Sequence, residues 1–519
     1  MTSGTPQQIE KSYDCVVIGA GNGGLTAAAR LAVSGARVLL LERHNLPGGF
    51  ATSFVRGRFE FEASLHQLAD VGSPTDKGGV RELFEDELGV YLDWVEVPEA
   101  FRLILADPRL PIDATVSYGE KTFIDDIEKA VPGSRESVMR YVALCKEMLD
   151  GINYVRAAKG NPDKKRLMTE YGALPKTAPY TMDQVAKALK IPERVRKILQ
   201  AQWPYIGPPP ERGSFTIFAA MIYKYITKSA WIPKQRSHEI ALALAKRFLE
   251  LGGEIQYNTQ AVEIQVQDGH VAGVKTSKGD VIKTRYVIAN TSPTLVYNRL
   301  IAPKSAVPEI ALKECNARVY GLSGMVVYMG LDTTLEKLGL KEYSYMIYDS
   351  ADDEAIYRSF GTLEDPKVQA SLCLNNAIPD CSPPGTSIVS LTALLRAEAW
   401  RDVSPQDYVK VKNRMANALI RRFEETTGAN LRDHIEEIEV AAPQTYARYT
   451  GTYDGIIYGY EPEPWDSILP RLSMTKEDQH IGGLQFCGGF AFRCHGYSSA
   501  LLSGPMAAQF ILRDMKEGK

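Results

Sequence analysis

Three closely spaced glycines near the N-terminus and one acidic residue after them have the spacing of a dinucleotide site. These residues are Gly19, Gly21, Gly24 and Glu42. Gly19 permits a sharp turn, Gly21 lets the backbone approach a pyrophosphate, and Gly24 allows a helix to pack closely on a strand. A carboxylate at Glu42 can accept the ribose hydroxyls of an adenine dinucleotide. The pattern therefore predicts a bound dinucleotide.

A strand, a helix and a second strand must position these residues. Val16–Ile18 is a β-branched run without a polar face, which predicts a buried parallel strand. Small and apolar residues from Leu25 to Val33 predict a helix that Gly35 ends, and Val38–Leu41 predicts the second strand. Together they form one βαβ unit.

The bulk composition describes an ordinary globular protein of more than one domain. A length of 519 residues predicts two or three domains, and 45% hydrophobic with 24% charged residues is typical of a soluble fold. A net charge of −3 argues against a nucleic-acid partner. Seven cysteines without a CxxC pair predict neither disulfides nor a zinc site, so we expect no bound metal.

No targeting or membrane-spanning segment is expected. The start of the chain, MTSGTPQQIEKSYD, lacks the apolar region of a signal peptide. No stretch offers the ~20 apolar residues that cross a bilayer. We therefore expect a cytoplasmic protein, attached at most to the surface of a membrane.

The chain leaves the first domain and returns to it. From Val80 to Tyr171 the pattern predicts mostly helical and irregular structure. A helix with Ser237 as its N-cap follows, then a hairpin turn at Asp268-Gly269 and a buried strand at Tyr286–Ala289. A helix, a meander and a strand in this order suggest that the chain has returned to the first domain.

A second excursion separates that strand from the C-terminal segment. It contains strand-like runs at Met325–Tyr328 and Ile388–Leu391, and a helix with Val411 and Met415 on one face. The last 40 residues carry a strand, a glycine turn and an amphipathic helix.

Motifs at both ends resemble one flavoprotein family. The glycine pair in RHNLPGGF, after Glu42, resembles the loop that runs under the flavin in the FAD-binding amine oxidase superfamily. FCGG, GYSSALLSG and AAQFIL are similar to the C-terminal flavin motif of that superfamily. The stretch PQTYARYTGTYDGIIYGYEP and the stretch FEFEASLHQLADVG look like the branch of phytoene desaturases, carotenoid isomerases and retinol saturases.

The resemblance implies the fold and the cofactor. It implies an α/β protein with a Rossmann-type FAD-binding domain assembled from discontinuous segments, 1–75, 235–295 and 480–519. The remaining segments, 76–234 and 296–479, would form an α+β substrate-binding domain that includes a helical subregion able to face a membrane. FAD should be non-covalent, because no cysteine lies where amine oxidases attach it. The expected cofactor-binding residues are Gly19, Gly21, Gly23, Gly24, Glu42, Arg43, Gly48, Gly49, Val262, Gly488, Gly489, Gly496, Ser498 and Ser499.

Two positions depart from the pattern of that branch. The branch commonly has paired glycines where this chain has Gln235-Arg236, and an acid is often found where this chain has Gly489. Both changes concern substrate fit and flavin contacts.

The resemblance implies an oxidoreductase that desaturates or saturates a carbon–carbon bond of a hydrophobic, isoprenoid or polyene substrate. The flavin moves a hydride at N5, and one proton must be placed by the protein. The candidates are His66, Tyr446, Arg448 and His495. A second nucleotide fold for NAD(P)H is absent from the pattern, so an unidentified electron acceptor or donor should dock transiently.

Alternatives stay open at this point. One is a flavin-dependent double-bond isomerase without net electron flow, and another is an amine oxidase-like dehydrogenase. A third is a binding protein like the Rab escort proteins and GDP dissociation inhibitors, which the intact glycines and Glu42 disfavour.

The segment from Gly213 to Arg236 allows two interpretations. It is apolar up to Tyr223 and then carries Lys224 and Lys228 beside aromatic residues, as suits a membrane boundary. The other interpretation is a core helix that lines the substrate cavity.

Overall fold

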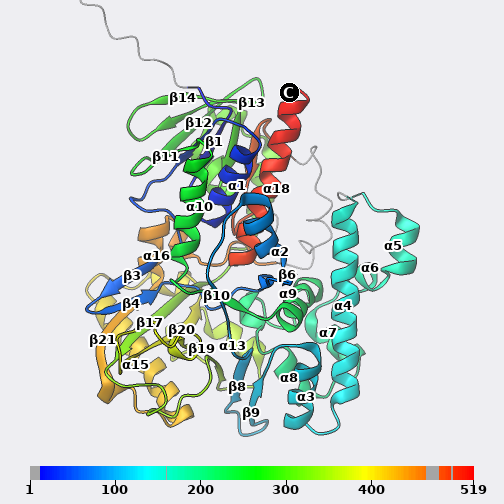
Figure 1. Cartoon of the computed structure of the whole chain (residues 1–519), viewed down its shortest axis with the longest axis vertical. Helices are drawn as coiled ribbons and strands as arrows, with labels where there is room; N and C mark the ends of the chain where they lie inside the picture. Colours follow the sequence, from blue (N-terminus) through cyan, green and yellow to red (C-terminus); the bar gives the residue numbers. More distant parts are fainter. Residues whose placement is uncertain (1–11, 159–160, 463–478, 492–494, 519) are drawn as a thin grey trace, which may run out of the picture.

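The computed structural model describes residues 12–158, 161–462, 479–491 and 495–518. Figure 1 shows one sheet with its helices at the top, a larger sheet below it, and a group of helices projecting at the side. The expected absence of a signal peptide concerns residues that lie mostly outside the described part. Among the described residues, we find no helix that combines the length and the apolar composition needed to cross a membrane.

A five-stranded sheet forms the upper part, and its neighbouring strands are all parallel. Its strands, in spatial order, are β11 (Glu254–Gln256), β2 (Val38–Leu41), β1 (Cys15–Ile18), β15 (Tyr286–Ala289) and β22 (Leu484–Phe486). Three distant regions of the chain thus build one sheet, which confirms the α/β class. The limits of the two domains stay a prediction.

Both faces of this sheet are buried, which explains its uniformly apolar strands. Val17 and Leu40 belong to the core shared with α1 (Asn22–Val33), α10 (His238–Glu250) and α18 (Tyr497–Lys516). Val16 and Leu39 face a smaller sheet on the other side. That sheet contains β14 (Val281–Lys283), β13 (His270–Thr276), β12 (Ala261–Gln267) and β16 (Ile301–Ala302).

The hairpin expected at Asp268-Gly269 is confirmed. It joins β12 to β13, and both turn residues have positive φ, 50° for Asp268 and 77° for Gly269. These angles match the two-residue turn whose twist suits a hairpin.

A seven-stranded sheet forms the lower part. In spatial order it contains β21 (Ile435–Ala441), β17 (Ser323–Leu331), β20 (Ser387–Leu395), β19 (Val368–Cys373), β18 (Ser344–Tyr348), β8 (Phe101–Leu105) and β9 (Ile112–Val116). α15 (Tyr408–Thr427) covers one face, where Met415 and Leu419 pack against Val327 and Leu391. The opposite face is open to the cavity described below.

The expectation of mostly helical structure between Val80 and Tyr171 is wrong for residues 94–116. β7 (Trp94–Glu96), β8 and β9 lie there, and β8 pairs in parallel with β18, so that Leu103 stands beside Met346. A short apolar run does not by itself distinguish a strand from a buried helix segment. The partner that makes it a strand lies far away along the chain.

The projecting helices and α9 form a second core with the edge of the large sheet. They are α3 (Glu120–Ala130), α4 (Arg135–Ala157), α5 (Lys164–Glu170), α6 (Ala173–Thr177), α7 (Met182–Ala188), α8 (Glu193–Leu199) and α9 (Phe215–Lys228).

α9 is a core helix, as one of the two interpretations of this segment predicted. No residue from Gly213 to Ala230 is exposed. Lys224 forms an ion pair with Asp70, and Lys228 forms one with Asp76. The apolar side chains of α9 are therefore buried within the protein, and the interpretation of this segment as a membrane face is wrong.

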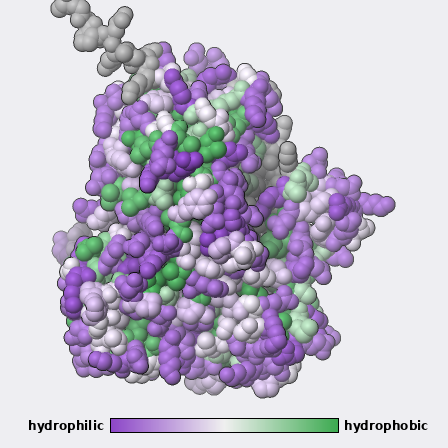
Figure 2. Space-filling view, in the orientation of Figure 1, coloured by the Kyte–Doolittle hydropathy of each residue, from purple (hydrophilic) through white to green (hydrophobic). Residues whose placement is uncertain are grey.

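Shorter elements connect these parts. They are β3 (Ser53–Arg56), β4 (Phe59–Glu62), β5 (Gly72–Ser73), β6 (Asp76–Lys77), β10 (Trp231–Pro233), α2 (Gly79–Arg81), α11 (Pro293–Leu295), α12 (Glu309–Ala317), α13 (Asp353–Ser359), α14 (Glu398–Arg401) and α16 (Pro443–Thr450). Hydrophilic residues cover most of the face drawn in Figure 2, which is hollowed between the main body and the projecting helices.

Candidate active site

The turn after β1 has the form that its glycines predicted. Gly19 adopts φ 95°, and Gly21 stands at the N-cap of α1 without a side-chain cap. The first amides of α1 therefore stay available to an anion at the helix N-terminus. Asn22 is buried, and its Oδ1 has no hydrogen-bond partner in the described part of the chain. These features suit a bound pyrophosphate.

Asn290, which the sequence analysis did not select, stands at the centre of this turn. Its amide donates to the carbonyl of Ile18 over 2.8 Å, and its Nδ2 donates to the carbonyl of Gly19 over 3.3 Å. A Cβ at Gly21 would lie 2.8 Å from that same Nδ2. Asn290 directly follows the buried strand β15, and a polar residue at the carboxyl edge of a parallel sheet is the signal that could have found it.

The C-terminal glycines close the same cradle. Gly488 has φ 85°, and its amide donates to Ser503 Oγ over 2.8 Å. A Cβ at Gly23 would lie 2.5 Å from the Gly488 nitrogen. Gly24 likewise has no room for a Cβ, because the Gly19 carbonyl fills that space. Glycines from both ends of the chain therefore meet at one point.

The second glycine pair lies beside the first. Gly48 donates its amide to the carbonyl of Ala20 over 2.7 Å, and Gly21 and Gly48 form a parallel bridge. Gly48 and Gly49 adopt φ 122° and 62°, which an L side chain rarely does.

Glu42 stands at the end of β2, facing the glycine turn. Its Oε2 accepts from the amide of Ala20 over 2.7 Å, and its Oε1 accepts from the amide of His44 over 2.8 Å. Each carboxylate oxygen has a further lone pair, so Glu42 can still accept a ribose hydroxyl. The two backbone contacts hold the carboxylate where that role requires it.

Arg43 and Val262 lie at the outer side of this region. Arg43 is exposed and donates from Nη2 to the carbonyl of Arg448 over 2.8 Å. Val262 is 39% exposed and stands opposite no residue of β13, because the pairing shifts between Ala261 and Glu263. Their roles in cofactor binding stay predictions.

One large cavity opens at the N-terminus of α18. Its volume is about 320 Å³, which is within the usual range for a small-molecule site. Gly496, at the N-cap of α18, has φ 95° and no side-chain cap, and with Ser498 and Ser499 it lines the cavity. Ser498 also donates to the carbonyl of Ala69 over 2.6 Å. Gly489 lies next to His495: a Cβ added at Gly489 would be 3.6 Å from the Cα of His495.

The seven-stranded sheet forms the floor of the cavity. Across neighbouring strands, Val326, Thr392, Ala370 and Met346 stand side by side on the face that lines it. Small side chains in the middle of this row leave a trough above the sheet. α4 and α9 supply the facing wall through residues such as Ile152 and Met221.

His66 lines the cavity, as expected for a residue near the flavin. Its Nε2 shares a hydrogen bond of 3.1 Å with Ser344 Oγ, and its ring meets Tyr205 edge-on at 5.5 Å between centroids. Burial lowers the pKa of His66 to about 3. The imidazole is therefore neutral at physiological pH, which disfavours His66 as a proton donor.

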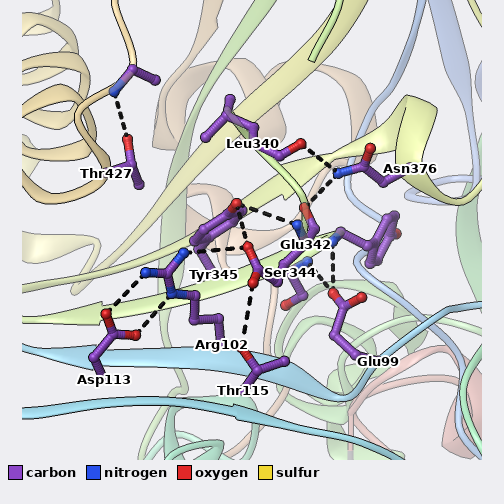
Figure 3. Close-up of polar contacts among 12 residues, drawn as sticks. Glu99, Arg102, Asp113, Thr115, Leu340, Glu342, Ser344, Tyr345, Asn376 and Thr427 are labelled. Carbon is purple, nitrogen blue, oxygen red and sulfur yellow. Dashed lines mark hydrogen bonds and ion pairs between the residues drawn. The ribbon is translucent and has the colours of Figure 1, made fainter. Parts of the chain in front are cut away.

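Ser344 is itself held by a buried carboxylate that the sequence analysis missed. Glu99 Oε1 accepts from the amides of Tyr343 and Ser344 over 2.6 and 2.9 Å (Figure 3). Burial raises the pKa of Glu99 to about 7. Beside it, Arg102 makes ion pairs with Asp113 and Glu342.

His495 lines the cavity from the opposite chain end. Its Nε2–H donates to the carbonyl of Tyr205 over 3.0 Å, because a carbonyl can only accept. Its ring stacks on Tyr458 with centroids 4.3 Å apart and planes 9° apart. His66 and His495 thus both contact Tyr205 and bracket one part of the cavity.

Tyr446 and Arg448 do not reach the cavity wall. Tyr446 is buried on α16, and its hydroxyl lies 3.4 Å from the hydroxyl of Tyr328. Tyr328 lines the cavity in its place. Arg448 is exposed, and its carbonyl accepts from Arg43. Their positions do not support the direct proton transfer that was expected of them.

Arg236 explains one departure from the family pattern. It adopts φ 72°, the left-handed region that favours glycine, which agrees with the glycine expected there from the resemblance. Its buried guanidinium donates to the carbonyls of Glu60 and Cys381. These contacts offset the strain of a non-glycine residue there.

Comparison with known proteins agrees with this architecture. The family model for FAD dependent oxidoreductases matches residues 14–305, and the model for flavin containing amine oxidoreductases matches residues 181–512. The chain belongs to the FAD-dependent oxidoreductases. Its cofactor is FAD, and the glycine cradle, the uncapped helix N-termini and Glu42 fit that group.

Individual relatives confirm the resemblance to retinol saturases and carotenoid isomerases. The all-trans-retinol 13,14-reductase of Danio rerio is 26% identical, over 97% of this chain and 87% of the relative. The chloroplastic prolycopene isomerase of Daucus carota is 25% identical, over 97% of this chain and 81% of the relative. The structure of an oxidoreductase from Methanosarcina mazei aligns with a TM-score of 0.62 at 15% identity, over 97% of this chain and 99% of that one.

Proposed function

We propose that this FAD-dependent oxidoreductase saturates or desaturates a carbon–carbon bond of a hydrophobic, isoprenoid or polyene substrate. The observation that carries the proposal is the cavity, which begins at the N-terminus of α18 and extends over the apolar floor of the large sheet. A long, flat and apolar substrate fits such a trough. The relatives named for retinol and prolycopene support a polyene.

FAD supplies hydride transfer at N5 when it is bound. The chain's own residues hold and orient the reactants. The glycine cradle and the first amides of α1 would bind the pyrophosphate, Glu42 would accept from the ribose, and the N-terminus of α18 would favour negative charge on the flavin. We propose that FAD is held without a covalent bond.

The described part of the cavity wall around His66 offers no protonated imidazole as a proton donor. A neutral imidazole and tyrosine hydroxyls line that part instead, and burial raises the pKa of Tyr205, Tyr225 and Tyr458. Such groups are poor proton donors, which suits a substrate whose charge can delocalise along a polyene. We propose His495 as the residue that handles the one proton that the reaction moves in addition to the hydride.

Anaerobic incubation with lipophilic alkenes tests the proposal. Reduced enzyme should become oxidised and a retinoid or carotenoid product should gain mass equal to two hydrogens, or the reverse should occur from oxidised enzyme. The flavin spectrum and the product mass are measured in the same sample. The proposal is contradicted if no polyene changes the flavin colour and none gives a product.

A double-bond isomerase is the second candidate, and similarity to prolycopene isomerase favours it. The same experiment distinguishes the two. A product of unchanged mass but changed retention time, formed while the flavin stays reduced, indicates isomerisation.

An amine substrate is less compatible with the cavity. Its charged lining residues include the cations Arg156 and Lys224 on the helix wall. Of the two carboxylates in the described lining, Asp70 pairs with Lys224 and Glu62 accepts from the amides of Leu65 and Ser237. Neither is placed to pair with a protonated amine, so we do not favour an amine dehydrogenase. The electron acceptor or donor, a cytoplasmic location and a peripheral membrane contact remain predictions.

A further inference from the structure

Arg156 is a cation at the solvent-exposed mouth of the cavity. Leu149, Ile152 and Arg156 lie on one face of α4 and line the cavity. In the described part of the chain, the guanidinium of Arg156 makes no hydrogen bond or ion pair. Arg156 is exposed to solvent on one side, while desolvation by the neighbouring residues lowers its pKa.

The nearest acidic group does not neutralise this cation. Asp70 lies close enough to influence Arg156, but its Oδ1 accepts from the amide of Gly79 over 3.2 Å and its Oδ2 pairs with Lys224. Glu62, the other carboxylate of the lining, is occupied by the amides of Leu65 and Ser237 and by the Ser237 hydroxyl. The positive charge of Arg156 therefore faces the cavity uncompensated.

A guanidinium presents paired N–H donors that match the two oxygens of a carboxylate. A diphosphate would need further cations or a metal, and the described residues contain no cluster that could hold a metal ion. A neutral hydrocarbon would leave this exposed charge to solvent alone, whereas a carboxylate at the cavity mouth would pair with it.

We propose that the substrate is an amphipath whose apolar chain lies in the trough and whose terminal carboxylate pairs with Arg156. This inference rests on the proposed function, because it assigns the end group of the same substrate. It goes further by setting the orientation, with the acid end at α4 and the apolar chain over the sheet.

Three probes that share one polyene chain test the charge preference: retinoic acid, retinol and the methyl ester of retinoic acid. Binding to the flavin-loaded protein is followed by the change in flavin absorption and by quenching of tryptophan fluorescence. The wild type should bind the acid about ten- to a hundredfold more tightly than the ester, as a charge-assisted hydrogen bond implies.

Two substitutions at the same position assign this preference to the guanidinium. Arg156→Met should bind acid and ester equally, while Arg156→Lys should keep part of the preference because it keeps the charge. Arg140→Met is the matched control, since Arg140 lies on the same helix and pairs with Glu136 at the surface. It should show the wild-type ratio of acid to ester.

Linoleate and methyl linoleate separate this inference from the proposed polyene chemistry. If no retinoid binds but linoleate binds better than its ester, and only in proteins with Arg156, the polyene class is wrong and the carboxylate site stands. If retinoids are bound and turned over without preference for the acid, the proposed function stands and this inference is overturned. It is also overturned by an acid preference that survives in Arg156→Met, or by no acid preference in either pair.

Discussion

Asn290 ties the glycine turn after β1 to the neighbouring strand, with its Nδ2 3.3 Å from the carbonyl oxygen of Gly19. The same side chain leaves no space for a Cβ at Gly21 or at Gly488. Segments from the beginning, the middle and the end of the chain thus define one cofactor cradle.

Gly23→Ala should lose most of its FAD. The added Cβ would lie 2.5 Å from the backbone nitrogen of Gly488, and backbone atoms cannot move as a side-chain end can. Flavin absorption per protein after gel filtration measures the loss. Gly361→Ala is the control, because its Cβ would meet nothing closer than 3.5 Å, and it should keep full flavin content.

Glu42→Gln should weaken FAD binding about ten- to a hundredfold, the effect of losing a charge-assisted hydrogen bond of ~1.5–3 kcal/mol. The side-chain NH2 of the glutamine would also place a donor against the backbone amide of Ala20 or of His44, which is itself a donor. Titration of the flavin-free protein with FAD measures the change. Asp14→Asn removes a carboxylate that accepts from the amide of Arg37, before β1 begins, and should leave the FAD affinity unchanged.

Ala370→Phe should block the substrate but not the cofactor. Ala370 stands in the middle of the trough, between Thr392 and Met346, so a phenyl ring there fills space that the substrate needs. We expect at least a tenfold loss of kcat/KM with a normal flavin spectrum. Ile438→Phe, on the exposed edge strand of the same sheet, should retain activity, and equal losses in both variants would contradict the trough.

His66 should make the protein less stable in mild acid. Burial lowers the pKa of His66 from 6.5 to about 3, so between these values the unfolded chain binds a proton that the folded chain does not. Stability from this group is fully present above pH 6.5 and falls as the pH drops. From pH 7 to pH 5, wild type should lose about 1–2 kcal/mol more unfolding free energy than His66→Gln. Denaturant titrations at both values of pH measure this, and parallel losses would show that the ring is not desolvated.

Glu99 should act in the opposite direction. Burial raises the pKa of Glu99 from 4.5 to about 7, so the folded chain holds a proton that the unfolded chain has released. Its contribution is fully present below pH 4.5 and is lost as the pH rises through 7. Between pH 5 and pH 8 the unfolding free energy of the wild type should therefore fall by about 1–3 kcal/mol more than that of Glu99→Gln. An identical decline in wild type and variant would contradict the burial argument.

Local patterns predicted the elements whose reasons are local. The helix after Ser237, the turn at Asp268-Gly269 and the strand Tyr286–Ala289 follow from the spacing of apolar residues and from turn chemistry, and the structure has all three. The side chain of Ser237 does not cap its helix, as was expected, but donates to Glu62. β8 was missed because Phe101–Leu105 is a strand only through its pairing with β18. The expectation of helical structure from Val80 to Tyr171 failed at residues 94–116 for the same reason.

The FAD-binding fold could be predicted from the sequence, because the spacing of Gly19, Gly21, Gly24 and Glu42 encodes a backbone shape that few other residues can adopt. The side chains that line the cavity could not be predicted in this way, because folding brings them together. Folding brought His66 and His495 to Tyr205, kept Arg448 at the surface, and set Asn290 in the cradle and Arg156 in the cavity wall. The physical reason is that backbone shape depends on neighbours along the chain, whereas burial, pKa and the pairing of charges depend on neighbours that folding brings together from distant segments.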